Sequence, residues 1–374
     1  MKIIKFILIL IPVIFICSCG VEKLPEKEHS GTEIVLEYAE QFKIYENSDG
    51  TYEIDISDGQ HFLVIPEGKS APEKTDRIVL QQPIENIYVP ASSAMDLFNG
   101  AGALDTVKMT STKLADWKIP AVTEAIESGK MLYVGKYNAP DYEMILSEGC
   151  GLAVESTMIY HSPETKEKLE SLNIPVMVER SSYELHPLGR LEWIKLYGIL
   201  TGHEKQANDF FNEKMKIFKE ISIDNDTETE RPTVAFFYIT ANGSANVRKS
   251  GDYISKMIEL AGADYIFTAD DLKTDENALS TMNMDMETFY EKARDADIII
   301  YNSTVEGELE NISQLMEKSG LLKDFKAVQE NNVWCTEKNM FQQTTGMCDM
   351  IQDIHMVVNG KADNENLTFL KRLE

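Results

Sequence analysis

The chain has 374 residues, which at about 150 residues per domain suggests two or three structural units. Hydrophobic residues make up 43% and charged residues 26%, so collagen-like and wholly disordered chains are excluded. Lysine and arginine number 36 against 62 aspartate and glutamate, giving a formal net charge of −26. A field of this sign repels polyanions such as DNA, and we therefore expect no nucleic-acid partner.

The first residues differ in character from the rest of the chain. Lys2 and Lys5 supply a positive start, and an almost unbroken apolar run follows from Phe6 to Ile16. At about 11 residues this run is shorter than the ~20 residues that a membrane-spanning helix needs, and it has the length of a secretory signal. We therefore expect a signal peptide over residues 1–18.

The apolar run ends in Ile16-Cys17-Ser18-Cys19-Gly20, which resembles a bacterial lipobox. The resemblance implies lipidation of Cys19, and acyl chains there would hold the protein at a membrane. Residues 19–32 are polar and contain proline and glycine, as a flexible tether would. The prediction is an extracytoplasmic protein that is lipid-anchored to the bacterial cell membrane.

Three cysteines remain, Cys150, Cys335 and Cys348, so at most one disulfide can form. The spacing does not say which pair would form it. The sequence has no CxxC or HExxH pattern, and a structural zinc site is not expected.

Apolar and polar residues alternate in several short runs over residues 33–76, which predicts a β-meander. Asp49-Gly50 and Asp58-Gly59 separate the runs, and Asp-Gly between alternating segments is a strong hairpin signal. The predicted strands are 34–36, 42–44, 52–56 and 62–65.

Residues 77–202 change to short apolar runs separated by helical stretches, which predicts βαβ units and a mostly parallel sheet. The strands are expected at 78–80, 87–89, 152–154 and 176–178, and the helices at 92–99, 139–147 and 162–172. A long helical region then begins at Pro187 and is interrupted at Gly198 and Thr201-Gly202.

A second long helix is expected over 203–222, and a second α/β block over 232–374, with helices at 252–261 and 285–293 and strands at 298–301 and 333–335. The predicted fold class is α/β. It consists of two Rossmann-like lobes joined by a single long backbone helix, with an N-terminal β-meander.

A weak internal repeat supports two lobes. Asp141-Tyr142-Glu143 precedes one predicted strand, and Asp285-Met286-Glu287 precedes another. Each repeat places a glutamate in the first turn of a helix. Such a glutamate also interacts favourably with the helix dipole, so the pattern by itself has a purely structural explanation.

Several strings in residues 77–356 resemble the substrate-binding lipoproteins of ABC importers for iron–siderophore, haem and cobalamin, the helical-backbone or type III periplasmic binding proteins. The resemblance rests on the lipobox, the long bridging helix, the string from Ser182 to Trp193, the turn Leu200-Thr201-Gly202 and the segment Met257–Ala263. In the last segment Ala263 stands where the family has a second glycine. The resemblance implies a solute receptor that is not an enzyme, has no intrinsic cofactor and acts as a monomer.

The resemblance also implies that one surface glutamate per lobe pairs with arginines of the ABC permease, which works with its ATPase. By position in the motif these residues are Glu143 and Glu287. The ligand implied first is a ferric siderophore, a metal chelate. Haem or cobalamin comes next, with His186 or His161 as an axial ligand.

Ligands of open parallel sheets bind beyond the carboxyl ends of the strands, and in two-lobed proteins they bind between the lobes. Tyrosine rings offer flat faces to a chelate, and arginines pair with carboxylate or catecholate groups. The predicted ligand-binding residues are Ser92, Ser93, Lys136, Tyr137, Asn138, Thr157, Met158, Arg180, Ser182, Tyr183, Tyr238, Asn242, Arg248, Ser303, Gln342 and Gln343.

Three other functional classes have weaker support in the sequence. Alternating methionines, Met282, Met284 and Met286, would suit Cu(I), but methionine at this spacing equally fills a core edge. Free Zn or Mn would need a cluster seeded by His186 and Glu155. A hydrolase is disfavoured because the GxSxG, GxxxxGK[ST] and GxGxxG motifs are absent from the sequence.

Overall fold

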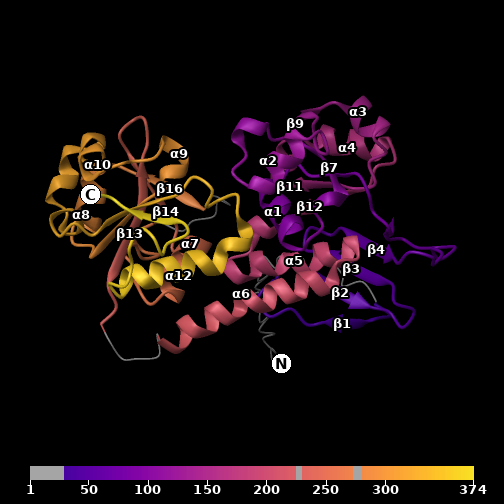
Figure 1. Ribbon diagram of the computed structural model, residues 1–374, viewed down its shortest axis with the longest axis horizontal. Coiled ribbons are helices and arrows are strands. Elements are labelled where there is room, and N and C mark those ends of the chain that lie inside the picture. The colour runs from indigo at the N-terminus through magenta and orange to yellow at the C-terminus, as the bar shows by residue number, and fades with distance from the viewer. Residues whose placement is uncertain (1–28, 225–229, 273–279) are drawn as a thin grey trace, which may run out of the picture.

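A computed structural model of the chain describes residues 29–224, 230–272 and 280–374. The predicted signal peptide, Cys19 and residues 19–28 of the predicted tether lie outside the described residues. The described chain forms three large sheets and one two-stranded sheet, connected and covered by helices, and Figure 1 shows two lobes side by side above a long helix, α6.

The first sheet has five strands in sequential order, β1-β2-β3-β4-β5. All neighbours are antiparallel except β4 and β5, which are parallel. The turn between β2 and β3 contains Gly50, and the turn between β3 and β4 contains Gly59, both with positive φ as Asp-Gly turns require. The bounds are β1 Thr32–Ile34, β2 Phe42–Glu46, β3 Tyr52–Ile56, β4 His61–Ile65 and β5 Ile78–Gln81.

The N-terminal lobe contains a parallel five-stranded sheet in the order β12-β11-β6-β7-β8. A two-stranded hairpin, β9 and β10, projects beside it. The strands are β6 Ile87–Tyr88, β7 Val107–Thr110, β8 Leu132–Tyr133, β9 Gly135–Lys136, β10 Ala139–Pro140, β11 Ala153–Ser156 and β12 Val176–Glu179. The helices are α1 Ser92–Gly100, α2 Pro120–Glu127, α3 Tyr142–Ser147 and α4 Pro163–Ser171, with short 3-10 turns at Leu104–Thr106, Leu114–Asp116, Thr157–His161 and Ser181–Tyr183.

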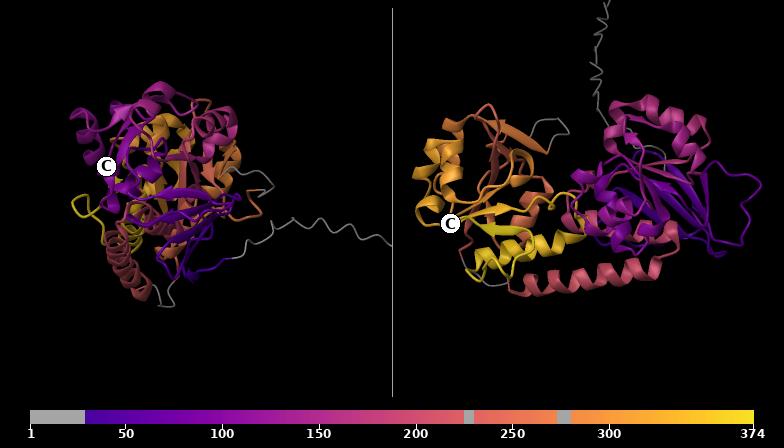
Figure 2. Two further views of the ribbon diagram at one scale, coloured as in Figure 1. Left: turned by 90° about the vertical axis from the view of Figure 1, so that its right-hand side faces the viewer. Right: turned by 45° about the horizontal axis from the view of Figure 1, so that its top comes forward.

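Two helices follow the lobe, α5 Pro187–Thr201 and α6 Glu204–Asp224. Gly202, at φ 73°, turns the chain between them in a left-handed conformation that favours glycine. At 1.5 Å per residue α6 is about 30 Å long. The right view in Figure 2 shows α6 along one side of the molecule, reaching from the first lobe to the second.

The C-terminal lobe has a mixed sheet in the order β16-β14-β13-β17-β18-β19, and β15 also pairs with β13. Its strands are β13 Thr233–Ile239, β14 Ala245–Arg248, β15 Asp264–Tyr265, β16 Thr281–Met284, β17 Ile298–Tyr301, β18 Val333–Thr336 and β19 Leu370–Arg372. Its helices are α7 Tyr253–Leu260, α8 Met286–Ala293, α9 Ser303–Glu306, α10 Ile312–Lys318, α11 Lys326–Gln329 and α12 Met347–Val358, with 3-10 turns at Gly320–Asp324 and Thr344–Gly346.

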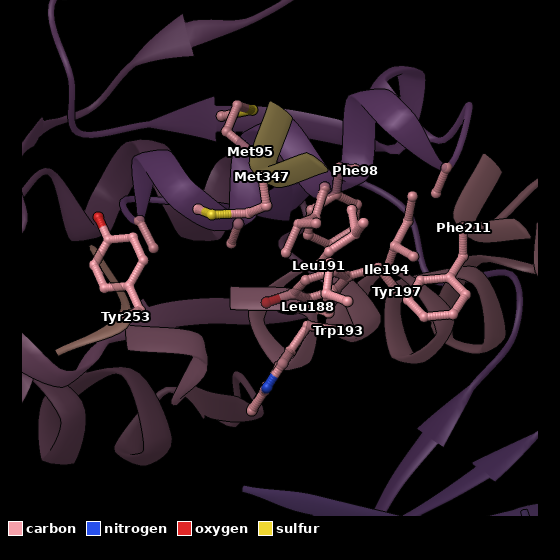
Figure 3. Packing of buried hydrophobic residues seen from close by; sticks show 14 of the residues in the cluster. Met95, Phe98, Leu188, Leu191, Trp193, Ile194, Tyr197, Phe211, Tyr253 and Met347 are labelled. Atoms are coloured by element: carbon pink, nitrogen blue, oxygen red, sulfur yellow. The ribbon is translucent and has the colours of Figure 1, made fainter. Parts of the chain in front are cut away.

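One buried hydrophobic cluster runs through both lobes. It includes Phe98 of α1, Trp193 of α5, Phe211 of α6 and Ile354 of α12, together with one face of the C-terminal sheet. Figure 3 shows side chains of α1 and α5 meeting there, with Tyr253 and Met347 of the C-terminal lobe close by. Two further clusters fill the outer faces of the two lobe sheets. Because the central cluster is continuous, the lobes share one core rather than resting against each other.

The structure corrects two predicted boundaries. The strand predicted at 78–80 exists as β5, but it extends the first sheet, where it pairs with β4, and is not part of the N-terminal lobe sheet. Residues 29–32 are not a free tether either. The His29 ring stacks on Tyr45 at 3.6 Å and lies 3.0 Å from Glu53 Oε2 and 3.1 Å from Asp55 Oδ2, and β1 already begins at Thr32. A short run of sequence does not reveal partners that are distant in the chain, so it shows neither the pairing of β5 with β4 nor the contacts of His29.

Two smaller observations bear on the sequence expectations. In the part of the chain that the structure covers, no helix is long and apolar enough to cross a membrane. Cys150, Cys335 and Cys348 are all free thiols, so none of the bridges that the sequence left open is formed.

Candidate functional site

Several of the predicted residues meet at the carboxyl ends of β11 and β12. The Arg180 guanidinium lies 4.4 Å above the Tyr183 ring, and its Nη1 donates to Tyr160 Oη at 3.0 Å. Thr157 Oγ1 and Ser182 Oγ are 3.4 Å apart. Met158, Tyr160 and Tyr183 are 50%, 44% and 39% exposed, so these large side chains present apolar surface to solvent.

A second arginine, Arg190, continues this group toward the C-terminal lobe. It lies in the first turns of α5, where its Nη2 donates to the Ser182 carbonyl at 2.7 Å and its Nε to the Glu184 carbonyl at 3.2 Å. Its guanidinium carbon is 3.6 Å from the ring centre of Tyr253, the first residue of α7. A cation over an aromatic face is attracted by the ring quadrupole.

Arg248 approaches the same ring from the C-terminal lobe. Its guanidinium carbon is 6.0 Å from the Tyr253 ring centre and 4.9 Å from that of Phe341. The side chain is 13% exposed, and its Nη1 lies 3.7 Å from the buried Asp252. Burial raises the pKa of Asp252, and the nearby Arg248 and Arg190 oppose that rise. We call this set, Arg180, Arg190, Arg248, Tyr183, Tyr253 and Phe341, the arginine cluster.

The arginine cluster brings together three guanidinium groups in a chain whose net charge is −26, and Arg248 among them already lies 3.7 Å from the Asp252 carboxylate. Guanidinium groups form bidentate, charge-assisted hydrogen bonds with carboxylates and similar anions. Aromatic rings from both lobes lie beside them. The cluster is therefore suited to an anionic, partly aromatic small molecule held between the lobes.

Arg190 and Tyr253 are not among the ligand-binding residues that the sequence predicts. Arg190 was part of the string that resembles the family, and its place near a helix start after a predicted ligand loop was the available signal. Tyr253 carried no signal, because its role depends on contacts with residues 63 positions before it and five positions before it in the chain.

The other predicted residues of the N-terminal lobe lie apart from the arginine cluster or face inward. Ser92 begins α1, and Ser93 Oγ donates to the buried Glu179 at 2.9 Å. Lys136 ends β9, and Tyr137 and Asn138 form the turn of the β9–β10 hairpin, where the Asn138 carbonyl accepts from Thr165 Oγ1 of α4. His186, the proposed axial ligand, uses Nδ1 to accept the Leu188 N–H at the start of α5 and stacks on Tyr38. His161 is exposed at the end of the 3-10 turn that precedes α4.

In the C-terminal lobe, Tyr238 lies half-buried in β13 and Asn242 in the exposed turn after it. Ser303 is 1% exposed and presents no surface to a ligand in this structure. Gln343 accepts from Asn339. Gln342 connects the lobes instead of pointing at a free site: its amide accepts from the Lys118 N–H and donates to the Asp116 carbonyl, both at 2.8 Å.

The two predicted docking glutamates occupy equivalent positions. Asp141 caps α3 and Asp285 caps α8, each accepting a backbone N–H at 2.9 Å, and Glu143 and Glu287 follow in the first turns. Both are exposed. Because α3 leads into β11 and α8 into β17, the start of each helix lies toward the carboxyl ends of its lobe's parallel strands. Neither carboxylate forms an ion pair within the described ranges.

Glu155, considered as a metal seed, is fully buried in β11. Neither carboxyl oxygen has a hydrogen-bond partner among residues that the structure describes, and no group of three His, Cys, Asp or Glu residues suited to a metal occurs in them. Burial raises the pKa of Glu155 from 4.5 to about 8. The folded protein therefore holds Glu155 protonated at neutral pH.

Because of this raised pKa, we expect Glu155→Gln to increase the free energy of unfolding by an amount that depends on pH. Below pH 4.5 the carboxyl is protonated in both the folded and the unfolded chain, so the two proteins should then be equally stable. As pH rises from 4.5 to about 8, only the unfolded chain ionises, and the wild type loses free energy of unfolding that the variant keeps. We expect a difference of about 3 kcal/mol at pH 7. Urea unfolding at pH 5, 7 and 8.5 measures it, with exposed Glu167→Gln as control; a difference that does not grow with pH would contradict the prediction.

Known proteins similar to this chain point to one family. The family model described as "Periplasmic binding protein" matches residues 101–339. An uncharacterized lipoprotein of Methanocaldococcus jannaschii is 26% identical over 348 residues, covering 88% of this chain and 85% of the relative.

Solved structures are similar to the fold. A periplasmic binding protein of Veillonella parvula aligns with TM-score 0.61 and 18% identity, covering 86% of this chain and 98% of that one. The periplasmic haem-binding protein of Vibrio cholerae aligns with TM-score 0.58 and 17% identity, covering 72% and 97%. At these identities the likeness concerns the fold, which in these proteins has two α/β lobes, as the sequence analysis predicted.

Proposed function

The chain belongs to the periplasmic binding protein family, and we propose that it captures an anionic ferric chelate of the siderophore class and delivers it to an ABC import permease. Proteins of this family bind solutes outside the cytoplasm and work with ABC permeases. The observation that supports the proposed ligand is the arginine cluster, in which Arg190 and Arg248 approach one tyrosine ring from the two lobes. A lipid anchor at Cys19 would keep the receptor next to the permease.

Anionic chelates suit this site for two reasons. Carboxylate and catecholate oxygens accept charge-assisted hydrogen bonds from guanidinium groups, and the remaining face of the ligand packs on tyrosine and phenylalanine rings. The strongly negative protein would otherwise repel an anion, so a local group of cations is needed to hold it. The same chemistry suits haem, which carries two carboxylates on a flat ring, and haem is the second candidate.

Arg190→Gln and Arg248→Gln test the proposal. Each loses charge-assisted hydrogen bonds worth about 1.5–3 kcal/mol, so affinity for an anionic ferric chelate should fall about 10- to 150-fold. Intrinsic-fluorescence titrations with a ferric catecholate, haem and cobalamin measure affinity. Arg294→Gln, at the exposed end of α8, is the matched control.

The outcomes separate the candidates. Tight binding of the ferric chelate, weakened by both variants, supports the proposal. If the protein binds only haem, and both variants weaken that binding, then haem and not a ferric siderophore is the ligand. Unchanged affinity in both variants would show that the arginine cluster is not part of the binding site. Native mass spectrometry of the protein purified from its own host, with ultraviolet–visible spectra, identifies the bound solute directly.

A further inference from the structure

The five-stranded first sheet, which we call the accessory sheet (β1–β5, residues 32–81), lies before the region that matches the family, since that match begins at residue 101. It is nevertheless built into the N-terminal lobe. Gln60, in the β3–β4 turn, donates to the Val176 carbonyl and accepts from the Val178 N–H, which satisfies the outer edge of β12. Figure 1 shows the sheet beside α5 and the N-terminal lobe.

The connection between β1 and β2 is held by two buried carboxylates. The five consecutive backbone N–H groups of residues 37–41 all donate to them: three to Glu192 and two to Glu184, at 2.8–3.0 Å. A side chain at Gly189 would come within 2.8 Å of the Tyr38 carbonyl oxygen, so the backbone of this connection lies directly against α5. These contacts fix Gln41, the last residue of the connection, relative to the arginine cluster.

Two residues of the accessory sheet connect to the arginine cluster: Gln41 contacts Arg180 directly, and Asp58 contacts it through Tyr160. Gln41 Oε1 accepts from Arg180 Nε at 3.1 Å and is itself held by Ser57 Oγ at 2.7 Å. Tyr160 Oη donates to Asp58 Oδ2 at 2.9 Å, which leaves the phenolic oxygen to accept from Arg180 Nη1. The hydrogen bonds form a closed circuit, because Ser57 and Asp58 are adjacent in the chain.

These hydrogen bonds use only part of the Arg180 guanidinium and leave its other N–H groups available to a ligand. Of the five N–H groups of an arginine, one goes to Gln41 and one to Tyr160. Within the described chain Arg180 has no further hydrogen-bond partner, and its plane lies over Tyr183. The N–H pair shared by Nη1 and Nη2 has the fork geometry that a carboxylate or catecholate accepts.

We propose that Gln41 and Asp58 are positioning residues for ligand binding: the accessory sheet orients Arg180 and Tyr160 so that the free edge of the guanidinium faces the bound anion. This inference rests on the proposed function. It makes the accessory sheet, which lies before the region that matches the family, part of the binding machinery of this chain. Gln41 and Asp58 act through Arg180 and Tyr160 and need not touch the ligand.

A double-mutant cycle tests the role of Gln41. We expect Gln41→Leu to weaken binding of an anionic ferric catecholate about 3- to 10-fold, and Arg180→Ala to weaken it further. In the Arg180→Ala background, Gln41→Leu should cause no additional loss. Gln41→Glu keeps the acceptor but adds a negative charge beside the proposed anion, so it serves as the control for the exchange measurement and not for affinity. Gln81→Leu, the same change on the outer strand β5, is the control and should bind as the wild type does.

A second measurement needs no ligand. The Arg180 Nε–H should exchange slowly with solvent in the wild type and in Gln41→Glu, and rapidly in Gln41→Leu, as followed by nuclear magnetic resonance with Arg180→Lys to assign the signal. Unchanged exchange in Gln41→Leu, or affinity losses that add in the cycle, would overturn the positioning role. If exchange changes as expected but the wild type binds no chelate, the positioning stands and the proposed ligand falls.

Discussion

Reversing both surface glutamates, Glu143→Arg with Glu287→Arg, is expected to reduce uptake of the ferric chelate to background while leaving chelate affinity unchanged. The two carboxylates are exposed in the first turns of α3 and α8, one on each lobe, and they are proposed to pair with arginines of the permease. Like charges placed opposite each other across an interface cost several kcal/mol, so two reversals should prevent docking.

The folded state should tolerate this change. Asp141 and Asp285 still cap the two helices, and an arginine in a first turn costs only about 0.3–1 kcal/mol through the helix dipole. Uptake of a radiolabelled ferric chelate by cells that carry the variant measures the effect, and fluorescence titration of the purified protein measures affinity. Glu164→Arg with Glu317→Arg, which reverses two exposed glutamates of α4 and α10, is the matched control.

Two results would contradict the docking role. Uptake that survives the double reversal would show that the permease recognises another surface. Weakened chelate affinity in the purified variant would place Glu143 or Glu287 at the ligand instead of at the permease. Each single reversal should give an intermediate rate of uptake, because one lobe would still dock.

Glu192→Ala is expected to have the largest effect on stability. Glu192 is fully buried in α5, accepts the backbone N–H groups of Glu37, Tyr38 and Ala39, and pairs with Lys195 at 2.6 Å. Its removal leaves these donors and a largely buried ammonium without their acceptor. Breaking a buried, hydrogen-bonded charge pair from one side costs about 3–5 kcal/mol.

Urea unfolding measures this loss, and limited proteolysis locates it. New cleavage should appear in residues 37–41 before the lobes are cut, since the carboxylates of Glu192 and Glu184 hold that connection. Glu192→Gln keeps an acceptor and should lose less. Glu213→Ala, at an exposed position of α6, is the control and should change the free energy of unfolding by less than about 0.5 kcal/mol. A loss below 1 kcal/mol in Glu192→Ala would mean that the connection is held by its other contacts.

Local patterns predicted much of the fold. The Asp-Gly pairs correctly predicted the hairpins of the accessory sheet, and the apolar run at Ile298–Tyr301 correctly predicted β17. Pro187 and the Gly202 turn marked the limits of α5, and apolar spacing gave α6 within two residues of its observed end. These features depend on a few neighbouring residues, so a single sequence carries them.

The contacts of the predicted binding residues were harder to predict. Arg180 was placed correctly at the end of a strand, but its partners Gln41 and Tyr160 lie 139 and 20 residues away. Gln342 is a polar loop residue of the kind that often contacts a ligand. In the structure it bonds to Lys118 and Asp116 across the lobes. A polar loop residue looks the same in sequence whether it faces solvent, a ligand or another loop.

The sequence alone therefore determined the family resemblance, the α/β class, the long connecting helix and the paired Asp-x-Glu helix starts, because each depends on local spacing or on a recognisable string. Only the tertiary structure decided that β5 belongs to the accessory sheet, that Glu192 and Glu184 clamp residues 37–41, and that Arg190 and Arg248 share one tyrosine ring. The physical reason is that these contacts join residues far apart in the chain, and their energy depends on burial and distance, which local sequence does not contain.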